Sequence, residues 1–219
     1  MKSVRWLAAV VCVLGLAMAA QAGLSVGGKL WYVSFGDDEL DSAILIGPKL
    51  EISGETFWLS GMFLFGSTEV SEGGVTEDID LQDGEALIGA SFQLLDIGVG
   101  IRDTTLRFRG DDVTIWGPMA YIGLGGPFGE TPFGWYIGGS YMFMDLGDLK
   151  DLQDDIEEMG GDADITGEHY NIEGGVSFGM ERFQATLGYR MKKFLNWDDK
   201  DENGDLTQSG LAASASFTF

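Results

Sequence analysis

Residues 210–219 read Gly-Leu-Ala-Ala-Ser-Ala-Ser-Phe-Thr-Phe, and they alternate with a strict period of two. Side chains point alternately to the two faces of a β-strand, so this stretch predicts a strand with two different faces. The face suited to lipid carries Leu211, Ala213, Ala215, Phe217 and Phe219, and the face suited to a polar lumen carries Ala212, Ser214, Ser216 and Thr218. A final strand must still hydrogen-bond both of its edges, and pairing with the first strand of a closed barrel achieves this.

The alternating final strand with its terminal Phe219 resembles the closing strand of bacterial outer-membrane β-barrels. The resemblance implies that Phe219 addresses the chain to the barrel-assembly machinery. Through its pattern, length and termini, the chain from residue 23 onward is similar to the broad OmpA-like and OmpW-like class of small barrels. That class is functionally mixed, so the resemblance implies a fold and a location and no specific task.

The first 22 residues have the features of a secretory signal peptide. Lys2 and Arg5 form a short basic region, residues 7–19 are apolar, and Ala20-Gln21-Ala22 is a small-x-small cleavage site. The alternative, a transmembrane anchor, is disfavoured because the apolar run is short and Gly-rich alternating sequence follows at once. The sequence thus predicts a signal peptide at 1–22 and a single domain at 23–219, exported to the outer membrane of a Gram-negative-type bacterium. This domain contains no cysteine, since the single Cys12 lies before it.

The composition is strongly acidic, with 35 Asp and Glu, 13 Lys and Arg, and a formal net charge of −22. This charge argues against nucleic acid as a partner and favours cations. No apolar run of about 18 residues follows the predicted signal peptide. The exported domain is therefore expected to be either soluble or a β-barrel, because only helices and closed barrels span a bilayer.

Alternating segments of about ten residues, separated by turn-like sequence, are typical of a membrane barrel. The chain has ten of them, at residues 24–35, 43–53, 55–66, 86–95, 97–109, 113–125, 133–144, 169–180, 183–194 and 210–219. They predict an all-β fold, a transmembrane antiparallel up-and-down β-barrel of ten strands. Segment 97–109 leaves eight strands as the alternative, because its four charged residues cannot all face inward without a bulge. These residues are Arg102, Asp103, Arg107 and Arg109.

The connections between these segments alternate between two kinds. Short ones are expected at residues 53–54, near Asp96, at 126–132 and at Glu181, and long or acidic ones at 36–42, 67–85, 110–112, 145–168 and 195–207. Membrane barrels pair short periplasmic turns with longer outer loops. The five long connections hold 28 of the 35 acidic residues. The sequence therefore predicts periplasmic termini and an acidic outer rim.

Aromatic residues gather toward both ends of the predicted strands, with Trp31 and Trp116 at the loop end and Trp135 at the turn end. Two aromatic girdles are expected where a membrane barrel meets the lipid headgroups. The alternative is a soluble secreted β-sandwich or lipocalin-like barrel, whose aromatic residues would gather in the middle of an inner face. The polar strand faces are largely Gly and Ser, which suit a narrow lumen better.

Charged residues of both signs fall at inward positions of the predicted strands. They are Lys29, Lys49, Glu51, Arg102, Glu173, Arg190 and Lys192. One interpretation is a salt-bridged plug that satisfies buried charge in a narrow barrel. The other is a polar passage for small solutes, whose selectivity these side chains would set. Ten strands leave little bore, because eight are just filled by side chains.

Residues 199–207 match most of a calcium loop. Oxygen ligands would come from Asp199, Asp201, Asn203 and Asp205, with Gly204 at the turn. The match ends where Gly210 stands in place of the bidentate Glu of an EF-hand, and no helices flank it. A Ca²⁺-binding loop and a solvated acidic hairpin tip remain the two interpretations.

An enzyme would have to use the single histidine, His169, beside Glu168 at the predicted outer rim. Omptin-type outer-membrane proteases are also ten-stranded barrels, but no Asp-His pairing of theirs matches this chain. Outer-membrane lipid A deacylases and acyltransferases use a His with a nearby Ser, and no Ser follows His169 closely. A hydrolase is therefore the distant alternative, and no catalytic residue, cofactor-binding residue or required cofactor is assigned.

The sequence predicts a non-enzymatic structural or surface protein. Its acidic outer loops would bind divalent cations such as Ca²⁺ and so bridge to the phosphates of lipopolysaccharide, alongside outer-membrane lipid as the other partner. The second interpretation is a narrow channel for small polar or cationic solutes, with the acidic rim as a cation funnel.

Overall fold

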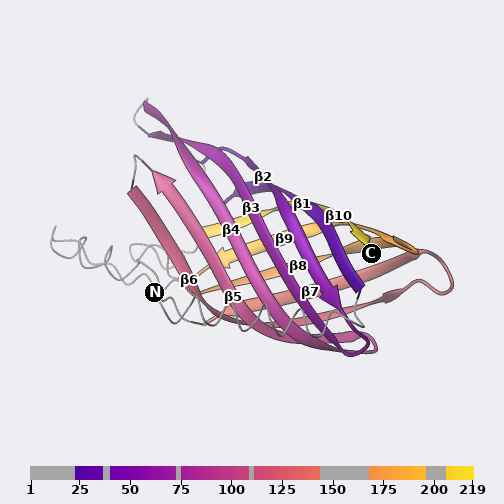
Figure 1. Cartoon of the computed structure of the whole chain (residues 1–219). Coiled ribbons are helices and arrows are strands. Elements are labelled where there is room, and N and C mark those ends of the chain that lie inside the picture. The colour runs from indigo at the N-terminus through magenta and orange to yellow at the C-terminus, as the bar shows by residue number, and fades with distance from the viewer. Residues whose placement is uncertain (1–22, 37–39, 73–74, 109–110, 144–167, 196–205) are drawn as a thin grey trace.

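The computed structural model is a closed antiparallel β-barrel, in which each strand pairs with the strands before and after it in the chain (Figure 1). It describes residues 23–36, 40–72, 75–108, 111–143, 168–195 and 206–219. The strands in these ranges are β1 (Gly23–Phe35), β2 (Ala43–Ser53), β3 (Phe57–Glu72), β4 (Val75–Phe92), β5 (Leu95–Phe108), β6 (Asp111–Pro127), β7 (Phe133–Met142), β8 (His169–Met180), β9 (Phe183–Phe194) and β10 (Leu206–Thr218). Within the same ranges, no helix is long and apolar enough to cross a membrane.

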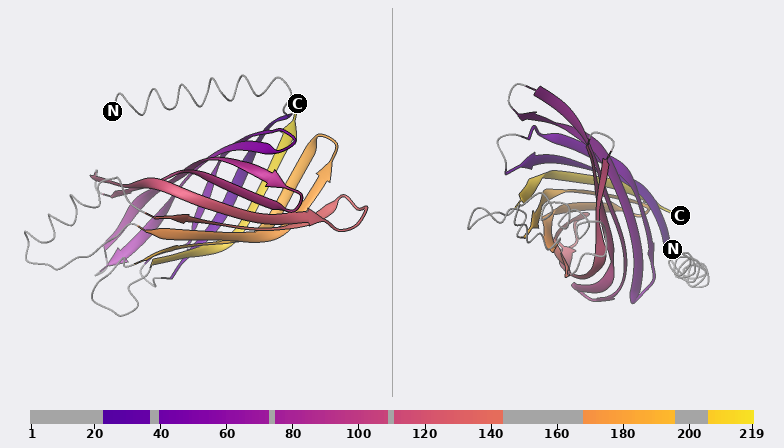
Figure 2. Two further views of the ribbon diagram at one scale, coloured as in Figure 1. Left: turned by 90° about the horizontal axis from the view of Figure 1, so that it is seen from below. Right: turned by 90° about the vertical axis from the view of Figure 1, so that its left-hand side faces the viewer.

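Strand β10 closes the barrel by pairing antiparallel with β1. Ser25 lies opposite Thr218, Trp31 lies opposite Ala212, and the backbone N–H of Phe219 donates to the carbonyl of Leu24 at 2.9 Å. The strand also has the expected two faces, because Leu211, Ala215, Phe217 and Phe219 are exposed while Ala212 is buried. The predicted ten-stranded closed barrel is confirmed, and Figure 2 shows its strands surrounding a common interior.

The outer loop predicted at residues 67–85 is wrong. Strand β3 runs on to Glu72 and β4 begins at Val75, so one ladder extends from Phe57↔Ala90 to Glu72↔Val75. The strands persist because the period of two continues through the acidic stretch, with Leu81 buried and Asp80 exposed. Acidic composition was a misleading sign of a loop here, because charged side chains also suit the solvent face of a strand.

The charges of strand β5 need no bulge, and the eight-strand alternative is wrong. Its ladder with β4 is unbroken from Asp80↔Arg107 to Phe92↔Leu95. Arg102 faces the interior, whereas the Arg107 side chain faces outward and is 45% exposed. Asp103 also lies on the outer face by alternation, and Arg109 lies outside the described residues.

The two rims of the barrel differ in their connections. At one rim, which we call the short-turn rim, β4 turns into β5 through Gln93 and Leu94 rather than near Asp96, and β8 turns into β9 through Glu181 and Arg182. Gln93 and Glu181 adopt positive φ values of 57° and 31°, as tight hairpins require. The start of β1 and the C-terminus lie at this rim too. The predicted signal peptide at 1–22 lies outside the described residues.

Apolar side chains fill part of the interior, where mostly Gly and Ser were expected. One cluster consists of Trp31, Val33, Ala43, Leu45, Met62, Leu64, Leu81 and Ala212, and a second consists of Leu87, Ile115, Met119, Met142 and Phe194. Trp31 therefore does not belong to a headgroup girdle. It is fully buried, and the guanidinium of Arg190 lies 4.5 Å from the centre of its ring.

Gly210 is required at the seam between β10 and β1. Its φ is +158°, and a Cβ on this residue would lie 1.8 Å from the carbonyl oxygen of Tyr32. Gly210→Ala should destabilise the folded barrel by about 1–3 kcal/mol, because the backbone of β1 cannot move away without opening the seam. The shift in thermal midpoint, followed by circular dichroism in detergent, measures this loss.

The matched control for this prediction is Gly28→Ala in the same seam. A Cβ at Gly28 would lie 3.6 Å from the carbonyl oxygen of Gly47, which is ordinary contact, so the midpoint should stay close to that of the wild type. Equal losses in the two variants would show that Gly210 has no special role in closure.

Candidate functional site

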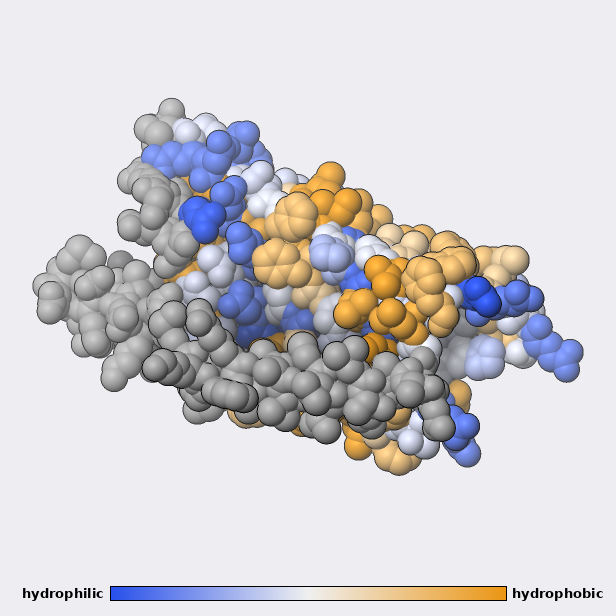
Figure 3. Space-filling view, viewed as in Figure 1, coloured by the Kyte–Doolittle hydropathy of each residue, from blue (hydrophilic) through white to orange (hydrophobic). Residues whose placement is uncertain are grey.

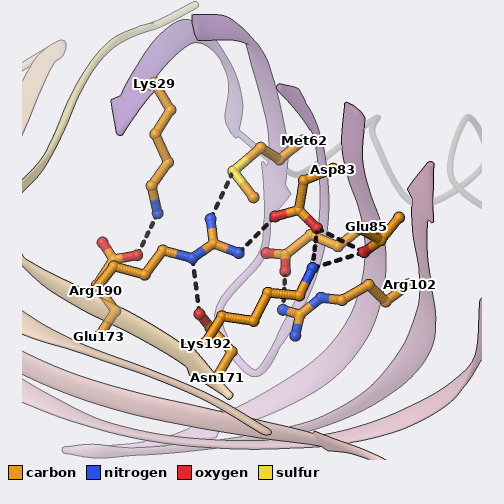
Figure 4. Close-up of polar contacts among 10 residues, drawn as sticks. Lys29, Met62, Asp83, Glu85, Arg102, Asn171, Glu173, Arg190 and Lys192 are labelled. Carbon is orange, nitrogen blue, oxygen red and sulfur yellow. Dashed lines mark hydrogen bonds and ion pairs between the residues drawn. The ribbon is translucent and has the colours of Figure 1, made fainter. Parts of the chain in front are cut away.

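A layer of charged side chains crosses the interior of the barrel (Figure 4). We call it the charged layer, and it consists of Lys29 from β1, Asp83 and Glu85 from β4, Arg102 from β5, Glu173 from β8, and Arg190 and Lys192 from β9. Four of these residues, Asp83, Arg102, Arg190 and Lys192, are almost completely buried. Charges removed from water in this way are stable only when they are paired and hydrogen-bonded.

Asp83 is the centre of the charged layer. Arg190 Nη2 donates to Asp83 Oδ2 at 2.9 Å, and Lys192 Nζ donates to Asp83 Oδ1 at 2.8 Å. Lys192 Nζ also donates to Thr104 Oγ1 at 2.6 Å. Strands β4 and β9 are five places apart in either direction around the ten-stranded ring. One carboxylate therefore joins opposite walls of the barrel.

The other members of the layer form pairs around this bridge. Lys29 contacts Glu173, whose second oxygen accepts a hydrogen bond from the hydroxyl of Tyr136 at 3.1 Å. Arg102 pairs with Glu85 on the neighbouring strand. Each carboxylate of the layer thus contacts at least one cation, and the layer holds the walls together from several strands.

A cavity of about 340 Å³ lies between the short-turn rim and the charged layer. Its lining begins at Ser53 and Gly54 of the β2–β3 turn and ends at Glu85 and Arg190 of the layer. On the other side of the layer, a space of about 10 Å³ beside Lys192 has room for one water. The layer therefore separates this cavity from the rest of the lumen, which is nearly filled by side chains.

The structure places all seven sequence-predicted lumen charges on the inner face. Lys29, Arg102, Glu173, Arg190 and Lys192 belong to the charged layer. The other two line the cavity, where Lys49 Nζ lies 3.3 Å from Glu51 Oε2.

Asp83 and Glu85 were not among the predicted lumen residues, because both fall in the stretch that was predicted to be an outer loop. The signal that could have found them is the period of two: Leu81, Asp83, Glu85 and Leu87 alternate with Gln82, Gly84 and Ala86. The alternation therefore leads directly from the acidic stretch into the segment that was recognised as a strand.

The residues predicted to bind calcium, Asp199, Asp201, Asn203 and Asp205, lie outside the described part of the chain. Within the described part, no group of three or more His, Cys, Asp or Glu side chains is arranged to hold a metal ion. A Ca²⁺ loop thus remains a prediction from the sequence.

His169 is the first residue of β8, at the rim opposite the short turns. Its side chain is fully buried, and its ring centre lies 4.8 Å from that of Phe194. The adjacent Glu168 accepts a hydrogen bond from the hydroxyl of Tyr141 at 2.7 Å. His169 is therefore packed against the interior cluster at Phe194, while Glu168 interacts on the outer side.

No family model matches the sequence, and no curated protein matches it in a sequence search. Among solved structures, the barrel is similar to the toluene transporter TodX of Pseudomonas putida, with 10% sequence identity and a TM-score of 0.30. The alignment covers 90% of this chain and 65% of the TodX chain, so this chain spans less than two thirds of the length of that protein. We therefore infer function from the geometry of the barrel itself.

Asp83→Asn should destabilise the folded barrel by about 3–5 kcal/mol, because it leaves Arg190 and Lys192 buried without their shared carboxylate. Asp80→Asn on the same strand is the matched control. Asp80 is 57% exposed and lies 4.0 Å from Arg107, so its loss should change stability by less than about 1 kcal/mol. Unfolding in denaturant measures both effects, and similar values for the two variants would refute a central role for Asp83.

Proposed function

We propose that this chain is an integral outer-membrane β-barrel with a closed lumen, and that it acts as a structural or surface protein and not as an enzyme or an open pore. The charged layer is the observation that carries the closed lumen. It joins opposite strands through buried side chains, so a solute in the cavity meets Arg190, Asp83 and Lys192 before it can pass.

The outer surface supports the membrane location. Every strand exposes large apolar side chains, for example Val99 on β5, Ile122 on β6 and Leu211 on β10, which are 57–61% exposed. Figure 3 shows apolar residues in a band between hydrophilic surfaces at the two ends of the visible face. A continuous apolar surface of this extent is unfavourable in water and suits lipid.

The edge of the proposed lipid-facing band that lies farther from the short-turn rim is the place where outward-facing residues become polar. On β5 the outward series changes from Ile101 to Asp103, and Asp103 is paired with Trp116 on β6. An aromatic residue beside the first charged position is typical of the headgroup region. Beyond it, the β3–β4 hairpin continues with outward acidic residues such as Asp80, which would lie in water outside the membrane.

The proposed orientation places the short-turn rim in the periplasm and the acidic connections outside, as in other membrane barrels. Carboxylates of the outer rim would bind divalent cations and bridge to the phosphates of lipopolysaccharide. The second candidate is a narrow channel for small polar or cationic solutes, and the cavity of about 340 Å³ is the observation that favours it. In that case the charged layer would have to open.

The closed lumen predicts that the wild-type barrel, inserted in a planar bilayer, gives no steady single-channel current. A variant that combines Asp83→Ala, Arg190→Ala and Lys192→Ala with Trp31→Ala and Leu64→Ala should conduct, because it removes the bridge between β4 and β9 together with large side chains that fill the lumen beyond the layer. Current from this variant would show that barrels of this chain insert under the conditions of the assay.

The channel candidate makes the opposite prediction, namely cation-selective steps from the wild type that change in Glu51→Gln or Glu173→Gln. Such steps would refute the closed lumen. A folded chain that stays monomeric and soluble without detergent would refute the membrane location.

The calcium loop predicts heat of Ca²⁺ binding when the folded barrel is titrated in a calorimeter. The double variant Asp199→Ala, Asp201→Ala should lose this heat, because it removes two oxygen ligands of the loop. Asp78→Ala in the β3–β4 hairpin removes an acidic residue elsewhere and should keep it. Calcium binding by the outer rim in general, without this loop, predicts equal heats from all three proteins.

A further inference from the structure

The charged layer is not electrically balanced. In the described part of the chain it holds four cations, Lys29, Arg102, Arg190 and Lys192, and three carboxylates, Asp83, Glu85 and Glu173. An uncompensated charge in such a buried position is strongly unfavourable, because the surrounding protein replaces its hydration poorly. The formal excess of one positive charge therefore needs compensation from outside the set.

Arg102 is the member of the layer with unused hydrogen-bonding capacity. It is 1% exposed, and its Nη2 donates to Glu85, whereas Nε and Nη1 have no hydrogen-bond partner among the described residues. By contrast, Arg190 uses all three of its nitrogens, which approach Asn171, Met62 and Asp83. Buried guanidinium donors without partners are uncommon in folded proteins.

From these two observations we propose that the charged layer contains a binding site for one small monovalent anion, of the size of chloride, at Arg102. The anion accepts a hydrogen bond from Nε or Nη1 and brings the layer to neutrality. A water molecule in the same place would satisfy the donor and leave the excess charge uncompensated. The size limit follows from the nearly complete burial of the guanidinium.

The cavity leads toward this site. Glu85, the direct partner of Arg102, lines the cavity, so an ion that enters from the short-turn rim comes to within one side chain of the guanidinium. Figure 4 shows the Arg102 side chain entering the layer with its guanidinium next to Glu85. The inference requires only the charged layer, and it is independent of membrane location and of conductance.

The first test is the thermal midpoint of the folded wild-type barrel in uncharged detergent, at constant ionic strength, with chloride replacing gluconate. Gluconate is too large for the site, so the midpoint should rise by about 3 °C for each tenfold increase in chloride once the site binds. Arg102→Gln should abolish this dependence. Arg107→Gln, an outward position on the same strand, should retain it.

A second measurement protects the test against a variant that fails to fold. Wild-type crystals soaked in bromide should show an anomalous peak within hydrogen-bonding distance of Arg102 Nε or Nη1. A midpoint independent of chloride, together with no peak at Arg102, would overturn the proposal and favour loss of a proton from Lys192 as the source of neutrality. A chloride dependence that survives in Arg102→Gln would overturn it as well, because surface binding would then explain the effect.

Discussion

The charged layer depends on one carboxylate that is shared by two cations from the opposite wall. Asp83 receives hydrogen bonds from Arg190 and Lys192 across the whole width of the ring. Buried ion pairs lose much of their attraction to desolvation, so their main contribution is often the selection of one arrangement over others. In this barrel the shared carboxylate links β4 to β9 across the ring, whereas Arg102 and Glu85 pair across the neighbouring strands β4 and β5.

The lumen divides into a filled half and an open half because glycines are unevenly distributed among its inner positions. Near the short-turn rim, the ring of Trp58 lies against Gly89 and Gly98, where an added Cβ would come within 2.4–2.9 Å of it. Glycine thus lets the ring lie along the wall, so that the cavity stays open. Beyond the layer, inner positions carry large side chains such as Trp31 and Leu64, which are fully buried and fill the space.

The period of two predicted ten strands and their two faces, because these depend on neighbouring residues, and the need to hydrogen-bond both edges of the final strand predicted the closure of the barrel. It could not predict which charges meet across the lumen. Asp83 and Arg190 are 107 residues apart in the sequence, and their contact depends on the strand number and register of the closed ring. The wrong loop prediction at residues 67–85 had a further effect. Because Asp83 was assigned to a loop, the predicted set of lumen charges lacked the carboxylate that pairs with Arg190 and Lys192.

The distribution of charge also affects whether cations can pass through the barrel. The chain carries 35 acidic and 13 basic residues, yet the charged layer holds four cations against three carboxylates. The proposed acidic rim would raise the local concentration of cations at the mouth, although its field weakens over about 8 Å at physiological ionic strength. In the layer, every carboxylate is already paired with a Lys or Arg side chain, so none is free to bind those same cations. The proposed acidic exterior and an interior of paired charges are therefore compatible with the proposed surface protein, which would gather cations without conducting them.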